Sequence, residues 1–326
     1  MTAPRSLVTG AGGFIGSHLT ERLVRDGHDV RAFVRYNSRG DRGQLELLPP
    51  EVIASIAVVS GDLRDIETVR RAARDRETIF HLGALIGIPY SYQSPLDVVS
   101  ANVVGTQNVI VAALDAGVRR LVHTSTSEVY GTAQYVPIDE EHPLQAQSPY
   151  AATKIAADKL VESYWRSFDL PAVTLRPFNT FGPRQSARAI IPTIIAQLTK
   201  GATVRLGSLT PSRDFTYVAD TVDGFVRAAT TPGIEGAVLN LGTGSDISIG
   251  ELVKRIAALL RVSPKIETDP ARVRPAKSEV ARLCAANARA RDVMGWVPRT
   301  SLDDGLRTTI EWMRTAPARR VESYAV

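Results

Sequence analysis

The stretch Thr9-Gly10-Ala11-Gly12-Gly13-Phe14-Ile15-Gly16 follows a short strand pattern at residues 6–9 and precedes a helical pattern at 14–26. Glycines at positions 10, 13 and 16 permit a tight turn, close approach of the backbone to a ligand, and close packing of a helix on a strand. The first helical turn then directs free N–H groups at the ligand, which suits a pyrophosphate. Because the stretch lies between strand and helix patterns, we expect a dinucleotide-binding turn.

Beyond this turn, strand and helix patterns alternate. We expect strands at 6–9, 30–34, 57–60, 78–81, 120–125 and 172–176, and helices at 14–26, 66–73, 98–116 and 150–168. This alternation is typical of an α/β protein with a doubly wound parallel sheet, the Rossmann arrangement. The sequence therefore predicts that fold class.

The pattern changes after Arg176, where prolines and glycines become frequent. We predict a Rossmann domain at 1–176 and a smaller C-terminal α/β substrate-binding lobe at 177–326, with helices at 249–260 and 302–313. A segment near 215–245 is expected to return to the first domain. The cleft between the two units is the expected ligand site.

The composition, with 44% apolar and 22% charged residues among 326, is that of a globular protein. The single cysteine, Cys284, and five scattered histidines predict no disulfide and no metal site. No apolar run approaches the roughly 18 residues of a membrane span, and no secretory pattern is present, so we expect a cytoplasmic protein without a membrane. The net charge of +5 comes from scattered arginines, which argues against nucleic acid and fits a small anionic ligand.

The end of the second predicted strand bears on the choice of cofactor. An acidic residue there usually binds the adenosine ribose of NAD, but this chain has Arg35, followed closely by Asn37 and Ser38. Arginine cannot accept hydrogen bonds from ribose hydroxyls and pairs well with a 2′-phosphate. The sequence therefore favours NADP, and NAD stays an alternative.

Tyr150 and Lys154 stand four residues apart on one predicted helix, so their side chains share a face. Ser148 and Pro149 are suited to the N-cap and the first position of that helix. The lysine ammonium and a positively charged nicotinamide would both favour the phenolate, so we expect Tyr150 to act as a base near neutral pH. The run Thr124-Ser125-Thr126-Ser127-Glu128 follows a strand, at the sheet edge where sites occur.

Taken together, these motifs resemble the extended short-chain dehydrogenase/reductase family of nucleotide-sugar enzymes. The resemblance includes Arg176-Pro177-Phe178-Asn179-Thr180-Phe181-Gly182-Pro183-Arg184, Arg213-Asp214-Phe215 and Arg274-Pro275. It implies an NAD(P)-binding Rossmann domain, a lobe that binds a nucleoside-diphosphate sugar, and a homodimer formed through two helices of each subunit.

The resemblance also implies roles for individual residues. The catalytic set is Thr126, Ser127, Glu128, Tyr150 and Lys154. The cofactor set is Gly10, Gly12, Gly13, Phe14, Ile15, Gly16, Arg35, Asn37, Ser38, Asp62, Leu63, Leu82, Ala84, Thr124, Tyr150, Lys154, Pro177 and Asn179. The substrate set is Ile86, Tyr90, Thr126, Asn179, Arg188, Arg213 and Arg274, the arginines being suited to phosphates.

Family members that epimerise, dehydrate or decarboxylate the sugar all begin by oxidising C4. A carboxylate such as Glu128 can remove the C5 proton of the resulting ketone and drive loss of water from C6, after which hydride returns to C6. We therefore expect a 4,6-dehydratase, with a 4-epimerase or a UDP-glucuronate decarboxylase as alternatives. Ser127 replaces the aspartate of dTDP-glucose dehydratases, and the Thr-Ser-Glu order resembles GDP-mannose 4,6-dehydratases and the decarboxylases. A non-catalytic NADP sensor is disfavoured by the intact Tyr150 and Lys154.

The segments 35–38, 85–92 and 185–192 resemble the N-acetylglucosamine nucleotide 4,6-dehydratases of legionaminic-type pathways. Ile86, Ile88 and Tyr90 would offer an apolar wall to an acetamido methyl group. The expected substrate is therefore an N-acetylhexosamine nucleotide, whereas the nucleobase has no readable signal.

Overall fold

The computed structural model describes residues 3–272 and 275–316. Its centre is a seven-stranded sheet in the order β3-β2-β1-β4-β5-β6-β11, and all neighbouring strands run parallel. The strands are β1 (Arg5–Thr9), β2 (Asp29–Arg35), β3 (Ile56–Gly61), β4 (Thr78–His81), β5 (Arg120–Thr124), β6 (Ala172–Pro177) and β11 (Val238–Leu241). This order confirms the predicted doubly wound α/β fold.

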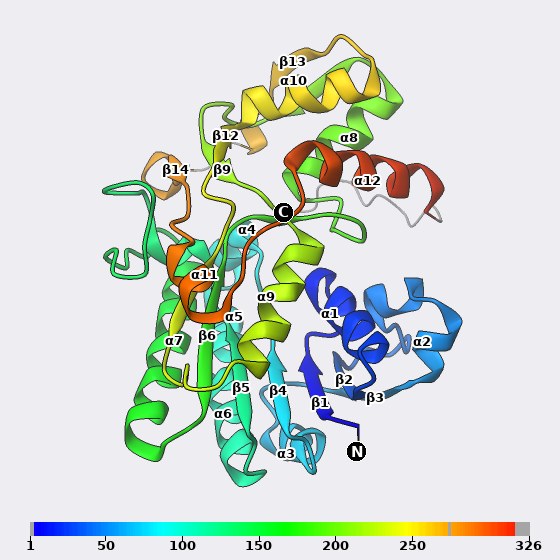
Figure 1. Cartoon of the computed structure of the whole chain (residues 1–326). Helices are drawn as coiled ribbons and strands as arrows, with labels where there is room; N and C mark the ends of the chain where they lie inside the picture. The colour runs from blue at the N-terminus through cyan, green and yellow to red at the C-terminus, as the bar shows by residue number, and fades with distance from the viewer. Residues whose placement is uncertain (1–2, 273–274, 317–326) are drawn as a thin grey trace.

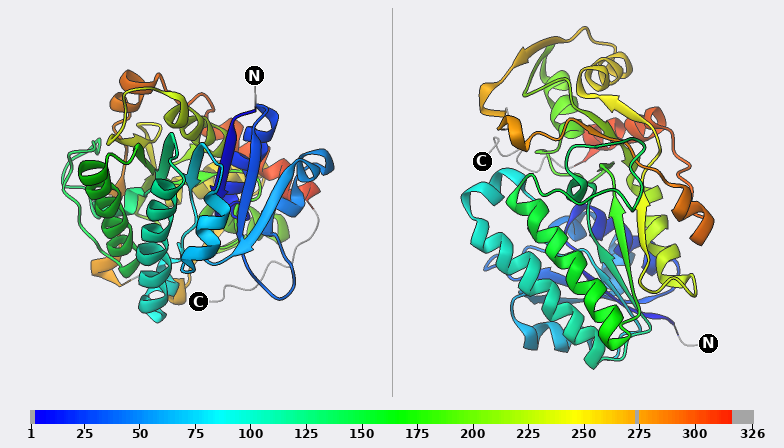
Figure 2. Two further views of the ribbon diagram at one scale, coloured as in Figure 1. Left: turned by 90° about the horizontal axis from the view of Figure 1, so that it is seen from below. Right: turned by 90° about the vertical axis from the view of Figure 1, so that its left-hand side faces the viewer.

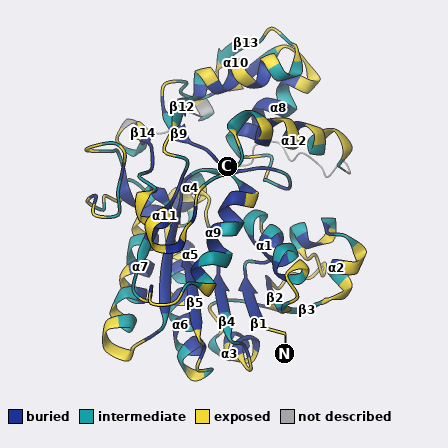
Figure 3. Cartoon of the chain, in the orientation of Figure 1, coloured by how far each residue is buried: buried dark blue, intermediate teal, exposed yellow. Residues whose placement is uncertain are grey.

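Helices cover both faces of the sheet (Figures 1 and 2). On one face lie α1 (Phe14–Arg25) and α9 (Val218–Thr230), whose apolar side chains pack in one core with strands β1 and β2. On the other face lie α3 (Ile66–Ala73), α6 (Gly105–Asp115) and α7 (Pro149–Phe168), which share a second core. The strands and the inward faces of these helices form the buried part of the molecule (Figure 3).

Local signals explain where these helices begin and end. Gly27, with φ of +84°, follows α1, and the N–H of His28 donates to the carbonyl of Leu23, which closes the helix end. At the start of α7, the Ser148 hydroxyl accepts from the N–H of Ala151, and Pro149 is the first helical residue. Both boundaries agree with the sequence predictions.

Residues 218–241 return to the sheet after the chain has left it. They form α9 and then β11, which pairs with β6 at the sheet edge. The sequence patterns gave no separate prediction of α9 or β11, although the resemblance predicted a return near 215–245. The proposed domain limits themselves stay a prediction.

A smaller group of elements lies beyond the carboxyl edge of the sheet (Figure 1). Its core joins α8 (Ile190–Lys200), α10 (Ile249–Leu260) and α12 (Leu302–Thr315). Short strands complete it: β8 (Thr203–Leu206), β9 (Ser212–Asp214), β12 (Asp246–Ser248), β13 (Lys265–Thr268) and β14 (Arg282–Leu283). The remaining elements are η1 (Gly43–Leu47), α2 (Pro50–Ala54), α4 (Ile88–Gln93), α5 (Pro95–Val99), η2 (Ser100–Val104), η3 (Ser127–Tyr130), β7 (Thr180–Phe181), β10 (Thr216–Tyr217), η4 (Pro270–Arg272), η5 (Ala276–Ser278) and α11 (Ala288–Met294).

One long helical stretch corrects an expectation. Pro95–Asp115, which comprises α5, the π-helical η2 and α6, is long and apolar enough to cross a membrane by length and composition alone. The claim that no segment approaches such a span is therefore wrong. About 44% of its most apolar window is buried inside the protein, where it packs against α3 and α7, as a helix of the core would.

Candidate active site

The glycine-rich turn after β1 brings the backbone of three segments together. Gly10 has φ of +69°, and a Cβ there would lie 2.8 Å from the backbone nitrogen of Gly83. A Cβ on Gly16 would collide with the carbonyl oxygen of Gly10, so only glycine lets α1 approach the turn this closely. Gly13 is the N-cap of α1 and makes no side-chain capping bond, so the first amides of the helix are left for a ligand.

Other features around this turn fit a dinucleotide. The Thr124 hydroxyl and the Asn179 amide nitrogen are buried without a hydrogen-bond partner among the described residues. Asp62 follows β3 at the same sheet edge, where a carboxylate is suited to a nucleoside. These features fit NAD or NADP. They are a glycine-rich turn, a helix N-terminus with free amide groups, and buried polar atoms that lack a partner.

The structure also places the cofactor candidates that follow β2. Arg35 ends the strand and is exposed. Asn37 shapes its own loop, because its Oδ1 accepts from the N–H groups of Arg39 and Asp41 and its Nδ2 donates to the carbonyl of Asp41. Ser38 lies in the same exposed loop. The loop thus presents Arg35 at the strand end, whereas the Asn37 amide is already engaged.

The candidates after β3 and β4 line the same edge. The Asp62 carboxylate is bound by the Arg64 guanidinium, whose hydrogen bond holds the Asp62 pKa below its usual value. Leu63 lies where a Cβ on Gly83 would contact it, 2.8 Å away. Leu82 and Ala84 are half-buried in the segment after β4, and Pro177 is the buried last residue of β6.

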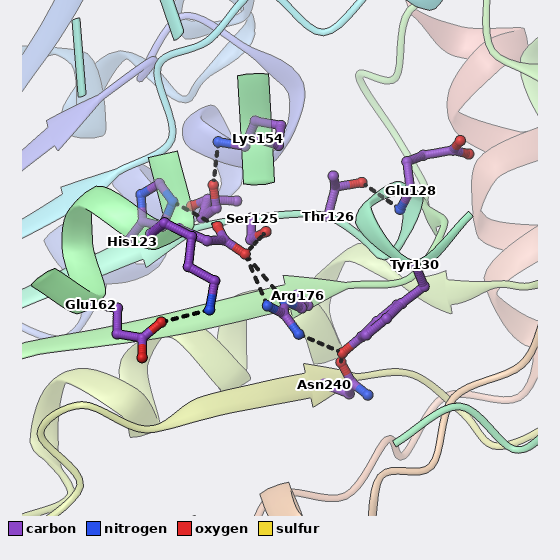
Figure 4. A network of polar contacts seen from close by, with 12 residues as sticks. His123, Ser125, Thr126, Glu128, Tyr130, Lys154, Glu162, Arg176 and Asn240 are labelled. Carbon is purple, nitrogen blue, oxygen red and sulfur yellow. Dashed lines mark hydrogen bonds and ion pairs between the residues drawn. The ribbon is translucent and has the colours of Figure 1, made fainter. Parts of the chain in front are cut away.

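Tyr150 and Lys154 project from the first two turns of α7 and are 7% and 4% exposed. Lys154 Nζ donates to the carbonyl oxygen of Thr124 across 2.6 Å, which fixes the lysine against the end of β5 (Figure 4). Burial lowers the pKa of Lys154 from 10.5 to about 8, and Asp158 partly opposes this shift. The ammonium is therefore held in a dry position beside the edge of the sheet.

The ionisation of Tyr150 differs from the sequence-based expectation. Burial raises the pKa of its phenol above the usual value of 10.0, and the nearby Glu128 carboxylate raises it further, although a hydrogen bond with Thr126 lowers it. Lys154 does not produce the expected lowering in the chain by itself. The physical reason is that desolvation of the phenolate outweighs the nearby donors.

Thr126, Ser127 and Glu128 form the turn into η3, beside Tyr150. The Thr126 hydroxyl caps η3 by accepting from the N–H of Glu128 across 3.3 Å. Ser127 is 3% exposed, whereas Thr126 and Glu128 are half-buried. Figure 4 shows the Glu128 carboxylate directed away from Arg176. Within the described part of the chain, no side chain donates to or pairs with this carboxylate.

A buried ionic network lies beneath this turn (Figure 4). Asp158, one turn beyond Lys154 on α7, accepts from the Ser125 hydroxyl at 2.7 Å and from the Arg176 guanidinium at 3.1 and 3.2 Å. Arg176 also donates to the Tyr130 hydroxyl, which donates in turn to Asn240. The sequence analysis missed Asp158, although its spacing of four residues from Lys154 places both on one helix face.

The proposed substrate residues are distributed unevenly. Arg213 is 7% exposed and donates to the Glu279 carboxylate across 3.3 Å. Ile86 is 70% exposed, and the Tyr90 hydroxyl donates to Asp97. Of the remaining candidates, Ile88 is buried in α4, Arg188 is exposed before α8, and Arg274 lies outside the described residues. The assignment of these residues to the substrate stays a prediction.

Among the described residues, no group of three or more histidine, cysteine, aspartate or glutamate side chains is placed to hold a metal ion.

Known proteins with similar sequences identify the family. The family model for GDP-mannose 4,6 dehydratase matches residues 7–309. The chain is 37% identical over 317 residues to a UDP-glucose 4-epimerase from Mycolicibacterium smegmatis, covering 95% of this chain and 98% of that protein. It is 32% identical over 313 residues to a dTDP-glucose 4,6-dehydratase from Streptomyces antibioticus, covering 94% and 92% respectively.

A solved structure agrees with these relatives over the whole fold. MoeE5, in complex with UDP-glucuronic acid and NAD, matches with a TM-score of 0.84 and 35% identity, covering 95% of this chain and 99% of that one. MoeE5 thus shares this fold and was solved with NAD bound. The chain belongs to the GDP-mannose 4,6-dehydratase family and is an enzyme of the NAD(P)-dependent nucleotide-sugar dehydratase and epimerase type.

Proposed function

We propose that the protein is a nucleoside-diphosphate-sugar 4,6-dehydratase. The observation that carries this proposal is the Glu128 carboxylate, which lies close enough to raise the pKa of Tyr150 and has no partner among the described side chains. Elimination of water across C5 and C6 requires a group that removes the C5 proton. Rotation of a ketone, which suffices for 4-epimerisation, requires no such group.

Four side chains take part in the proposed reaction: Thr126, Glu128, Tyr150 and Lys154. Thr126 hydrogen-bonds the C4 hydroxyl and Tyr150 takes its proton, while Lys154 holds the cofactor ribose. When bound, the nicotinamide would supply a two-electron acceptor for the hydride of C4 and then a donor of that hydride to C6. With C4 a ketone, Glu128 removes the acidified C5 proton, the C5–C6 double bond forms, and the C6 hydroxyl leaves as water with the proton that Glu128 delivers. When C6 receives the hydride, C5 takes up one proton, which balances the proton that Tyr150 removed from the C4 hydroxyl, so the net change is loss of one water.

The proposed cofactor is NADP. Arg35 supports this proposal. It is exposed at the end of β2, which is where a bound dinucleotide would present a 2′-phosphate on its adenosine ribose. The Asp62 carboxylate, which could favour NAD by accepting from ribose hydroxyls, is already bound by Arg64. We expect NADP to bind more tightly than NAD, and we expect Arg35→Ala to abolish this preference.

The proposed sugar is an N-acetylhexosamine. Ile86 is 70% exposed after β4 and provides apolar surface that an acetamido methyl could cover. Tyr90 supports this assignment through its ring alone, since its hydroxyl is engaged by Asp97.

The proposed assembly is a homodimer that acts in the cytoplasm. Leu96, Val99 and Val104 lie on the stretch from α5 to η2 and are 82%, 42% and 46% exposed. Apolar side chains gathered on one helical stretch are typical of a surface that another subunit covers.

A 4-epimerase is the second candidate, favoured by the 37% identity to a UDP-glucose 4-epimerase over 95% of the chain. Incubation with UDP-, GDP-, CDP- and dTDP-hexoses and their N-acetyl forms, followed by mass spectrometry, separates the two. A product lighter by one water supports the dehydratase. An epimer of unchanged mass would contradict it and establish the second candidate.

A further inference from the structure

A directed chain of hydrogen bonds links the strand before the glycine turn to the catalytic helix. The Thr106 hydroxyl gives its only hydrogen to the main-chain carbonyl of Asn102, so the proton between Thr106 and His81 Nε2, 3.0 Å apart, is carried by His81. His81 Nδ1 is then the acceptor and takes the hydrogen of the Thr9 hydroxyl across 2.8 Å, while the Thr9 oxygen accepts from the N–H of Gly83 at 3.1 Å. Burial lowers the pKa of His81 well below its usual value, so the ring stays neutral and keeps this direction.

The chain continues through η2, a π-helical segment between α5 and α6. The Thr106 hydroxyl donates to the main-chain carbonyl of Asn102 across 2.6 Å. Asn102 lies in the middle of η2 and is 1% exposed. A π-helical turn inside a longer helix is uncommon and often marks a functional position. Here it rotates one asparagine toward the sheet edge.

The Asn102 amide uses every hydrogen-bonding group that it has. Its Oδ1 accepts from the N–H of Leu85 at 2.7 Å, and its Nδ2 donates to the Leu85 carbonyl at 2.9 Å and to the Thr153 hydroxyl at 3.0 Å. Thr153 donates onward to the main-chain carbonyl of Tyr150 across 2.7 Å. One side chain therefore joins the segment after β4 to the turn of α7 that carries the phenol.

We infer that Asn102 and Thr153 are positioning residues, which set the distance between the sugar-facing segment at Leu85 and the Tyr150 phenol. This inference rests on the proposed function, in which the two sides hold one sugar. A buried network with all its donors and acceptors satisfied has a single geometry, so it fixes both sides at once. Displacement of a reacting group by about 1 Å from a remote change can cost roughly a hundredfold in rate.

Thr153→Val tests this directly, because valine keeps the shape and removes both hydrogen bonds. We expect kcat for the nucleotide sugar to fall about ten- to a hundredfold, with the dissociation constant of the cofactor changed less than twofold. Thr153→Ser restores the hydroxyl and is expected to restore most of the rate. Asn102→Asp, which loses both Nδ2 donors, is expected to behave like Thr153→Val.

Thr309→Val is the matched control, since Thr309 is equally buried and donates to the Gly305 carbonyl within α12, remote from α7. It is expected to lower the melting temperature to a similar extent without changing kcat of the folded enzyme. An unchanged kcat in Thr153→Val, or equal losses in Thr153→Val and Thr153→Ser, would overturn the inference.

Crystal structures of the wild type and of Thr153→Val provide a readout that does not depend on turnover. The expected result is a shift of residues 85–87 relative to the first turn of α7. Superposable structures would overturn the positioning role. If the wild type converts no nucleotide sugar, the proposed function fails, and this structural comparison still decides the inference.

Discussion

Glu128 is the side chain on which the choice between dehydration and epimerisation depends. In Glu128→Gln, the amide cannot accept the C5 proton, so formation of the 4-keto-6-deoxy product is expected to fall by about 10²- to 10⁴-fold. Oxidation at C4, which needs Tyr150, is expected to persist. The measurement is the spectrum of the nicotinamide together with the mass of the sugar product. Glu141→Gln, at an exposed carboxylate paired with Arg289, serves as the control. Deoxygenation at the full rate in Glu128→Gln would remove the role given to this residue.

The buried Lys154 is expected to make the stability of the protein depend on pH. Its pKa is about 8 in the folded chain and about 10.5 when exposed, so between these values the unfolded state binds more protons. Stability of the cofactor-free protein therefore rises with pH across that window, by up to about 3 kcal/mol from this group alone. The increment is lost progressively as pH falls from 10.5 to about 8.

Urea unfolding of the wild type and Lys154→Met from pH 7.5 to 10.5 measures this effect. As pH rises, the unfolding free energy of the wild type is expected to increase relative to that of Lys154→Met. Parallel stability curves would show that the lysine is not desolvated.

Residue spacing was sufficient to predict that Tyr150, Lys154 and Glu128 lie near one another, because two of them are four residues apart on a helix and the third follows a strand end at the same sheet edge. Spacing could not give the pKa of Tyr150, because its direction depends on burial by segments far away in the sequence. For the same reason the Asp158–Arg176 pair was missed: its partners come from α7 and β6. The occupation of the Asn37 amide by its own loop likewise depends on loop geometry.

Because α1 packs closely on the turn that follows β1, one added methyl group there is expected to weaken cofactor binding. Gly16→Ala places a Cβ against the carbonyl of Gly10, so the helix must move away from the turn. Cofactor affinity is expected to fall at least tenfold, measured by fluorescence titration with NADPH and NADH. Gly201→Ala is the control, since a Cβ there meets nothing within 4 Å. Unchanged binding in Gly16→Ala would contradict the assigned cofactor site.

Where residues such as glycine, proline or serine mark the end of a helix or strand, the boundary was predicted to within a few residues. The helices α1 and α7 are examples. The π-helical η2 was not, because the apolar pattern at 98–116 is continuous and the extra residue per turn is stabilised by tertiary bonds of Asn102. Likewise α8 was not predicted, because Pro192 interrupts its helical pattern. α9, which contains no proline, was not predicted either.

Six of the seven strands of the central sheet were predicted from sequence patterns, and its last strand, β11, was not. β11 is only four residues long, and its place beside β6 is decided by pairing across the fold. In the small lobe the predicted helices at 249–260 and 302–313 are confirmed as α10 and α12. Its short strands were missed, because they are stabilised by partners distant in sequence.

The proposed homodimer is tested by Leu96→Glu. Leu96 is 82% exposed, so a charge there costs the monomer little but would be buried against the second subunit. Sedimentation is expected to show a dimer for the wild type and a monomer for the variant. A monomeric wild type, or a variant that dimerises equally well, would refute this interface.

In the proposed reaction, hydrogen removed from C4 of the sugar is returned to C6. This transfer can be followed with a nucleotide N-acetylhexosamine carrying deuterium at C4, by NMR and mass spectrometry of the product. We expect the label at C6 of a 4-keto-6-deoxy sugar, and no transfer in Tyr150→Phe. Label found again at C4, in an epimer that keeps its C6 hydroxyl, would contradict it.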